Sequence, residues 1–178
     1  MLVLREDGSA SIFGYDGSTV VEDYLYEVTE EGENTYGLTF YGVLVDCTDM
    51  DNPKLSKEID YMNMTITISE ENLFQAAFKG EARLYDYRRI NDSMTKTMMG
   101  STIFSEEGLQ SAKAAVDYLS RDYEFSQLFY FGVEEDIDTT YYAFAIGSEY
   151  GFTVYWVSSR DLRIFTEDEF YKIYYATP

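Results

Sequence analysis

The first ninety residues alternate between apolar and polar positions with a period of two, which is typical of half-buried β-strands. The dipeptides Asp7-Gly8 and Asp16-Gly17 separate alternating segments, and both residue types favour the tight turns of hairpins. The pattern therefore predicts an antiparallel meander. Its expected strands are Leu2–Leu4, Ser9–Phe13, Thr19–Thr29, Thr35–Val45, Glu58–Ile68 and Ala82–Ile90.

Two segments of this half are less regular. Residues 46–57 are polar and contain Asn52-Pro53, so we expect the longest loop there. Ser69–Gly80 fits either a short helix or a turn followed by a strand. The strand is favoured, because Ala82–Ile90 then supplies a hairpin partner.

The second half opens with helical periodicity. Ser105 is a favourable N-cap, and the two glutamates that follow it suit the positive end of a helix. One buried stripe is predicted along this helix, at Leu109, Ala112, Val116 and Leu119. Further on, Thr166 and Glu169 form a capping box that starts a last helix through Tyr174. The strands expected between the two helices are Gln127–Val133, Thr139–Ile146, Phe152–Ser158 and Leu162–Phe165.

These elements define an α+β fold that is mostly antiparallel β. We expect an N-terminal β-meander, then a helix packed on a second antiparallel meander, then a short C-terminal helix. Residues 1–90 and 105–178 are predicted to be two subdomains joined by a linker over 91–104, because Asn91–Gly100 is polar and has no clear period. The alternative is that both parts form one compact domain.

Charge changes this picture most. The 178 residues contain 33 acidic and 13 basic side chains, for a net charge of −20. Residues 1–90 carry a net −11 and residues 91–178 a net −9, so the charge is not confined to a tail. Both nucleic acid and anionic membranes are bound through basic surface, so we expect neither as a direct ligand. A cationic protein partner fits the charge instead.

The missing residue types exclude most common chemistry. The chain has no histidine, which removes Ser-His-Asp and Cys-His catalysis and the commonest zinc ligand. Cys47 is the single cysteine, and Asp46 beside it raises a thiol pKa rather than activating the thiol. Phosphate-binding glycine motifs are absent. A carboxylate pair is the remaining route to catalysis, but with 33 acids such a pair is expected by chance. We therefore expect a non-catalytic protein without cofactor or metal.

Two acidic clusters are the candidate binding residues. The first comprises Asp46, Asp49 and Asp51, and the second comprises Glu134, Glu135, Asp136 and Asp138. Neither has the spacing and turn glycine of a calcium loop, so solvated loops are favoured over metal sites. A stacking platform is a further possibility, but alternating aromatic residues more often pack in a core. Its members would be Tyr141, Tyr142, Phe144, Tyr155 and Trp156.

Charge density decides whether such acids imitate nucleic acid. Spread over a folded surface of about 9,000 Å², 33 carboxylates are too dilute to match B-DNA, which carries one charge per ~1.7 Å of its axis. Imitation requires that the acids gather on one face. Alternate residues of a strand lie about 6.7 Å apart, roughly twice the phosphate spacing of one strand. Pairs with this spacing include Asp49 with Asp51 and Glu134 with Asp136.

Two hypotheses of function follow. The first is an inhibitor that occupies the basic nucleic-acid groove of a partner protein, of the anti-restriction or anti-CRISPR type that phages encode. The second is a ligand- or partner-binding β domain of a Gram-positive surface protein or lipoprotein. We favour the first, because a net charge of −20 exceeds the ~2–8 that keeps a small domain soluble.

The compartment follows from weaker signals. The single cysteine and the absence of an apolar signal segment after Met1 predict a cytoplasmic protein. No apolar run approaches the ~20 residues that span a bilayer, so no membrane partner is expected. If the chain is a piece of a longer protein, an extracellular or cell-surface location is the alternative.

Overall fold

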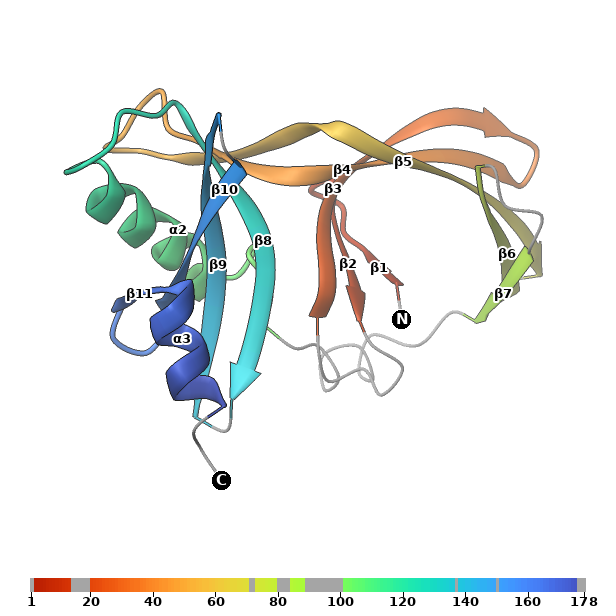
Figure 1. The fold of residues 1–178 in the computed structure, drawn as a ribbon. Helices are drawn as coiled ribbons and strands as arrows, with labels where there is room; N and C mark the ends of the chain where they lie inside the picture. The colour runs from red at the N-terminus through yellow and green to blue at the C-terminus, as the bar shows by residue number, and fades with distance from the viewer. Residues whose placement is uncertain are drawn as a thin grey trace.

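A computed structural model describes residues 2–13, 20–70, 73–79, 84–88, 101–136, 138–149 and 151–175 of the chain. These residues form an antiparallel sheet with one central and one short C-terminal helix (Figure 1). The predicted α+β fold, a meander followed by a helix on a second meander, is thus confirmed. The predicted turn at Asp16-Gly17 and the polar segment Asn91–Gly100 lie outside the described residues.

The sheet contains eleven strands in the described part of the chain. Those of the first half are β1 (Leu2–Leu4), β2 (Ser9–Phe13), β3 (Val20–Gly32), β4 (Thr35–Asp46), β5 (Lys54–Glu70), β6 (Leu73–Phe78) and β7 (Leu84–Arg88). Those of the second half are β8 (Gln127–Asp136), β9 (Thr139–Ser148), β10 (Gly151–Ser158) and β11 (Ile164–Thr166). The main path is β1-β2-β3-β4-β8-β9-β10-β11, and β5, β6 and β7 branch from β4.

Strand β4 joins the two halves because its two ends pair with different strands. Its first part, from Thr35 to Tyr41, pairs with β3, whereas Leu44–Asp46 pairs with the start of β8. Between these parts the register with β5 shifts at Gly42, and the side chain of Glu58 occupies the space that a Cβ atom there would need. In Figure 1, β4 and β5 run across the molecule, with β1–β3 below their middle and β8–β10 below one end.

Both helices begin where capping residues predicted them. Helix α2 (Glu106–Leu119) starts at Ser105, whose hydroxyl accepts a hydrogen bond from the Gly108 N–H at 3.0 Å. Helix α3 (Glu167–Tyr174) starts at Thr166, and the side chains of Thr166 and Glu169 complete the expected capping box. Both helices pack on the second meander and both contact β10; α2 also contacts β9, and α3 also contacts β11.

The core has three parts. The largest lies between α2 and the β4–β8–β9–β10 part of the sheet, and includes Val45, Val116, Leu128, Tyr142 and Phe144. A second, centred on Phe40 and Met64, fills the first meander. A third lies under α3 on β9 and β10 and comprises Ala143, Trp156, Phe165 and Phe170. The second meander is therefore buried on both faces.

Two local predictions were wrong. Strand β5 starts at Lys54, so the predicted loop over 46–57 is shorter, because Lys54 to Lys57 pair with β4 despite their polar sequence. Leu109 is half exposed rather than part of the buried stripe of α2. The buried face of α2 instead contains the small residues Gly108, Ser111, Ala112 and Ala115, together with Val116 and Leu119.

The proposed division into 1–90, 91–104 and 105–178 stays a prediction. Strands from both parts nevertheless belong to the same hydrogen-bonded sheet, through the pairing of β4 with β8. Residues Ser101 to Phe104 of the predicted linker also pack closely, and Ile103 is fully buried in the largest core.

The contact between α2 and residues 102–103 explains the unusual face of this helix. A Cβ atom on Gly108 would lie 2.6 Å from the Ile103 Cα and 2.6 Å from the carbonyl oxygens of Thr102 and Ile103. These neighbours are backbone atoms, which do not move aside as a flexible side chain does. Gly108 therefore permits the segment before α2 to lie directly against the first helical turn.

We expect Gly108→Ala to lower the free energy of unfolding by about 1–3 kcal/mol, because overpacking against the backbone outweighs the roughly 1 kcal/mol gain in helix propensity. Chemical denaturation followed by circular dichroism measures the change. Gln110→Ala, on the exposed side of the same turn, is the control and should stay within about 0.5 kcal/mol. A Gly108→Ala variant as stable as the wild type would contradict the close approach.

Candidate functional site

The structure separates the two acidic clusters along strand β8. Asp46 pairs with Gln127 at the beginning of β8, whereas Glu134, Glu135 and Asp136 form its end. Nine residue steps at about 3.3 Å place these ends roughly 30 Å apart. The seven predicted residues therefore form two groups, at the upper and lower ends of β8 in Figure 1, rather than one continuous row.

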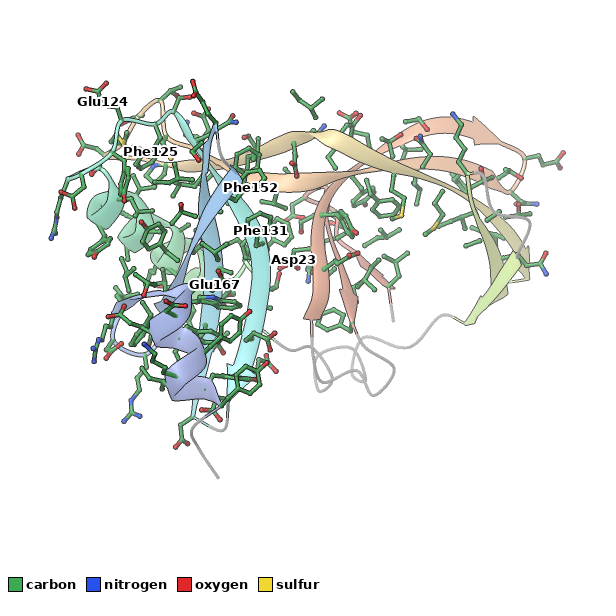
Figure 2. All side chains as sticks on the ribbon, viewed as in Figure 1. Asp23, Glu124, Phe125, Phe131, Phe152 and Glu167 are labelled. Atoms are coloured by element: carbon green, nitrogen blue, oxygen red, sulfur yellow. The ribbon has the colours of Figure 1, made fainter. Side chains whose placement is uncertain are left out.

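The upper acidic group contains more acids than the sequence clusters suggested. The Asp46–Asp51 loop lies beside α2 and the following connection, because Lys113 donates to the Asp51 carbonyl at 3.1 Å and the Cys47 N–H donates to the Ser126 carbonyl at 2.8 Å. Glu124 lies on this connection at the same end of the molecule (Figure 2). We define the upper acidic group as Asp46, Asp49, Asp51, Asp122 and Glu124, with Lys54, Lys113 and Arg121 as nearby cations.

The lower acidic group consists of Glu134, Glu135, Asp136 and Asp138. Its members do not all point to one side. Glu134 accepts a hydrogen bond from the Tyr174 hydroxyl of α3 at 3.4 Å, whereas Glu135 accepts one from the Ser101 N–H at 2.6 Å on the opposite face of the sheet. Glu135 therefore supports the segment before α2, and the other three are exposed.

The strands between these groups carry no opposing charge. Residues 122–159 contain seven acidic side chains and neither lysine nor arginine. These acids lie before β8, at the end of β8 and in the turns that follow, whereas β9 and β10 contain no charged residue. The ion pairs described in the structure, Lys57 with Glu27 and Lys113 with Asp117, both lie outside this segment. Arg121 and Arg160 flank this segment, and the net charges of the two halves are similar, −11 for residues 1–90 and −9 for residues 91–178.

A buried carboxylate lies where the two halves meet. Asp23 on β3 is buried, and its two oxygens accept four hydrogen bonds. Oδ1 accepts from the hydroxyls of Ser11 at 2.5 Å and Thr102 at 2.7 Å. Oδ2 accepts from the Ile103 N–H at 3.0 Å and the Tyr130 hydroxyl at 3.1 Å. One side chain thus connects β2, β3, β8 and the segment before α2.

Neighbouring polar groups extend this junction. Arg5 donates to the Ser11 hydroxyl at 3.1 Å, and the Tyr142 hydroxyl lies 3.3 Å from that of Ser105. Burial, followed by the charge of Asp23, raises the pKa of Tyr130 well above its usual value, so this phenol remains a hydrogen-bond donor. The four donors to Asp23 come from β2, β8 and the segment before α2, so its carboxylate is a structural link between these parts.

Sequence reasoning gave Asp23 no role, although it alternates with Val21 and Leu25 along the strand predicted over Thr19–Thr29. The available signal was a carboxylate on the apolar face of an otherwise alternating strand. Its partners were not visible, because Thr102 and Tyr130 are 79 and 107 residues away in the chain.

The aromatic residues divide between core and surface. Tyr142, Phe144, Tyr155 and Trp156 are buried, so their expected packing role is confirmed. A second set lies around α3. Trp156 stacks on Phe170 at 4.0 Å between ring centroids, and Phe170 stacks on Tyr174. Tyr174 makes an edge contact with Tyr175, which stacks on Tyr171. This series begins in the core and ends with exposed tyrosines, a feature that sequence reasoning missed.

A separate aromatic patch lies on the same face of the sheet, beyond the start of α3 (Figure 2). Phe131 and Phe152 are 52% and 54% exposed, and their rings meet edge to face (Figure 2). Phe152 contacts Phe129 at 4.8 Å and Phe131 at 5.3 Å between centroids. We call Phe129, Phe131 and Phe152 the phenylalanine patch.

The single thiol is poorly placed for chemistry. Cys47 is buried in the largest core, and its thiol donates to the Val45 carbonyl at 3.3 Å. Burial is the main cause that raises the pKa of Cys47 to about 11, and the charge of Asp46 adds to it. In the part of the chain that the structure describes, no three histidine, cysteine or acidic side chains are grouped so that they could hold a metal ion.

Comparison of this chain with protein-family models, curated protein sequences and solved structures found no match. Among the described residues, neither helix has the length and apolar character needed to cross a membrane. Any function must therefore be argued from the surfaces themselves.

We expect Asp23→Asn to lower the free energy of unfolding by about 2–3 kcal/mol, since one of the two acceptor oxygens becomes a donor that faces existing donors. Urea denaturation measures this change. Asp122→Asn, an exposed acid at the end of α2, removes the same charge and should shift stability by no more than about 0.5 kcal/mol. If the Asp23→Asn and Asp122→Asn variants were equally stable, the hydrogen bonds to Asp23 would contribute little to the free energy of unfolding.

The environment of Cys47 predicts slow labelling of the folded protein. With a pKa of about 11 rather than 9.0, the thiolate population near pH 8 is roughly 100-fold smaller than for an unperturbed thiol. Ellman's reagent should therefore react with one thiol per chain quickly in denaturant and much more slowly in buffer. Rapid labelling of the native protein would contradict the burial of Cys47.

Proposed function

We propose that this protein is a non-catalytic inhibitor that binds a basic protein at the surface which that partner uses for nucleic acid. The observation that carries the proposal is the segment of residues 122–159, which contains seven acids and no base and has exposed carboxylates near both ends of β8. Exposed carboxylates at both ends of β8 attract a cationic surface over long range and speed its association.

The spacing of the two acidic groups supports a partner that normally binds a duplex. The groups are separated by roughly 30 Å, close to the ~34 Å of one turn of B-DNA. Two basic patches that contact phosphates one turn apart would each meet one group. The sequence suggested imitation of nucleic acid by a single row of carboxylates. Two separate acidic groups would require fewer carboxylates than such a row.

The phenylalanine patch favours a second candidate function. Phe131 and Phe152 are more than half exposed, and they adjoin each other on one face of the sheet. Exposed aromatic side chains of this kind are common at binding surfaces. A ligand- or partner-binding β domain from a cell-surface protein would use this patch, with the acidic residues serving solubility.

Affinity capture tests the proposed function. The immobilised protein is incubated with nuclease-treated lysate of its native host at about 50 mM and about 500 mM NaCl, conditions that differ strongly in charge screening. We expect retention of a basic nucleic-acid-binding protein at low salt, its loss at high salt, and its displacement by added duplex. Retention that salt and duplex do not affect would support the second candidate instead.

Charge-neutralised variants locate the contact on the captured partner. Replacing Asp46, Asp49 and Asp51 by Asn, or Glu134, Asp136 and Asp138 by Gln and Asn, should each slow association about tenfold at low salt. The matched control replaces three exposed acids outside both groups, Glu6, Glu33 and Glu107, by Gln. Stopped-flow or surface plasmon resonance measures the rates. If the control slows association equally, net charge alone is responsible and the two groups are not binding surfaces.

A further inference from the structure

Helix α3 presents a stripe of exposed aromatic and acidic side chains. Glu167, Tyr171 and Tyr175 follow each other at intervals of four residues and therefore share one face of the helix. Tyr171 and Tyr175 stack at 5.6 Å between ring centroids and are 42% and 73% exposed. We call these three residues the α3 stripe.

The α3 stripe is fixed in place from below. Phe170, which is buried and whose ring lies 5.6 Å from that of Tyr171 between centroids, stacks on Trp156 of β10 with an interplanar angle of 10°. Tyr174 stacks on Phe170 at 5.1 Å and donates a hydrogen bond to Glu134 of β8. The exposed rings therefore extend a rigid core cluster, so little conformational entropy is lost when a ligand covers them.

Carboxylates surround these rings. Burial, then the charges of Glu167 and Glu134, raises the pKa of Tyr171, and Glu134 also raises the pKa of Tyr174. Glu167 lies at the start of α3, over the strands of the second meander (Figure 2). The helix also carries Lys172, whose charge acts on the capping Glu169. The face around Tyr171 thus combines flat π surfaces with two negative charges.

We propose that the α3 stripe binds an arginine-bearing segment of a basic protein. A guanidinium group is planar, so it stacks on a tyrosine ring while its N–H groups donate to a carboxylate such as Glu167 or Glu134. A lysine ammonium lacks both the flat surface and the paired donors. The inference rests on the proposed function, because it names the side chain of the basic partner that the acidic protein recognises.

Calorimetric titration with two synthetic peptides tests the inference. One is a capped peptide of alternating arginine and glycine, and the other replaces every arginine by lysine. At about 150 mM NaCl, where simple charge attraction is screened, we expect the arginine peptide to bind about fivefold more tightly than the lysine peptide. Trp156 is the single tryptophan and stacks on Phe170 of α3, so we expect its fluorescence to change when a peptide binds at this helix.

The double variant Tyr171→Ala with Tyr175→Ala should abolish the preference for arginine. The matched control is Tyr118→Ala, because Tyr118 lies on α2 and is 43% exposed, nearly the same as Tyr171. Tyr171→Phe keeps a flat ring and should keep the preference, which separates stacking from loss of helix stability. Circular dichroism verifies that each variant is folded.

The outcomes distinguish this inference from the proposed function. Equal affinity for both peptides, or an unchanged preference in the double variant, overturns the α3 stripe as the site. If binding of the arginine peptide is instead lost when Asp46, Asp49 and Asp51 are replaced by Asn, the proposed function stands and only the α3 stripe is wrong as the binding site. If neither peptide binds the wild type at low salt, both are overturned.

Discussion

The structure depends on one buried carboxylate. Asp23 ties β3 to the segment before α2 through Thr102 and Ile103, and to β8 through Tyr130. A buried charge is costly unless every oxygen has a partner, so these four donors must be present together. Their positions depend on Gly108, which lets residues 102–103 lie against the helix. The acidic second meander is consequently held in one orientation on the first, and its surfaces are presented rigidly.

Charge and aromatic residues have separate tasks in this protein. Most large rings of β9 and β10 are buried between helix and sheet and provide the apolar area that stabilises the fold. On α3, contacts between aromatic rings extend from this core to the surface, where Tyr171 and Tyr175 are exposed beside carboxylates. A net charge of −20 repels itself within a compact fold, and this repulsion opposes the stability that the buried rings provide.

Local patterns in the sequence were sufficient for most elements. Alternation gave the strands, and the capping residues Ser105 and Thr166 gave the helix starts, because both are short-range signals. The pairing of β4 with β8 has no local signal, nor has the junction at Asp23. Leu109 was misplaced because the buried face of α2 is set by the approach of Ile103 to Gly108, a tertiary contact. The acidic clusters were found, but their separation along β8 required coordinates.

The double pairing of β4 also orders events during synthesis. Its residues Leu44–Asp46 pair with Gln127–Phe129, which the ribosome adds about 80 residues later. At about 5–20 residues per second, Leu44–Asp46 remains without this partner strand for roughly 4 to 16 s after its own synthesis. Unpaired edges on nascent chains recruit strands from neighbouring chains, and that is how aggregates begin. Because neighbouring chains carry the same negative charge, they repel one another. The acidity therefore reduces aggregation before β4 pairs with β8.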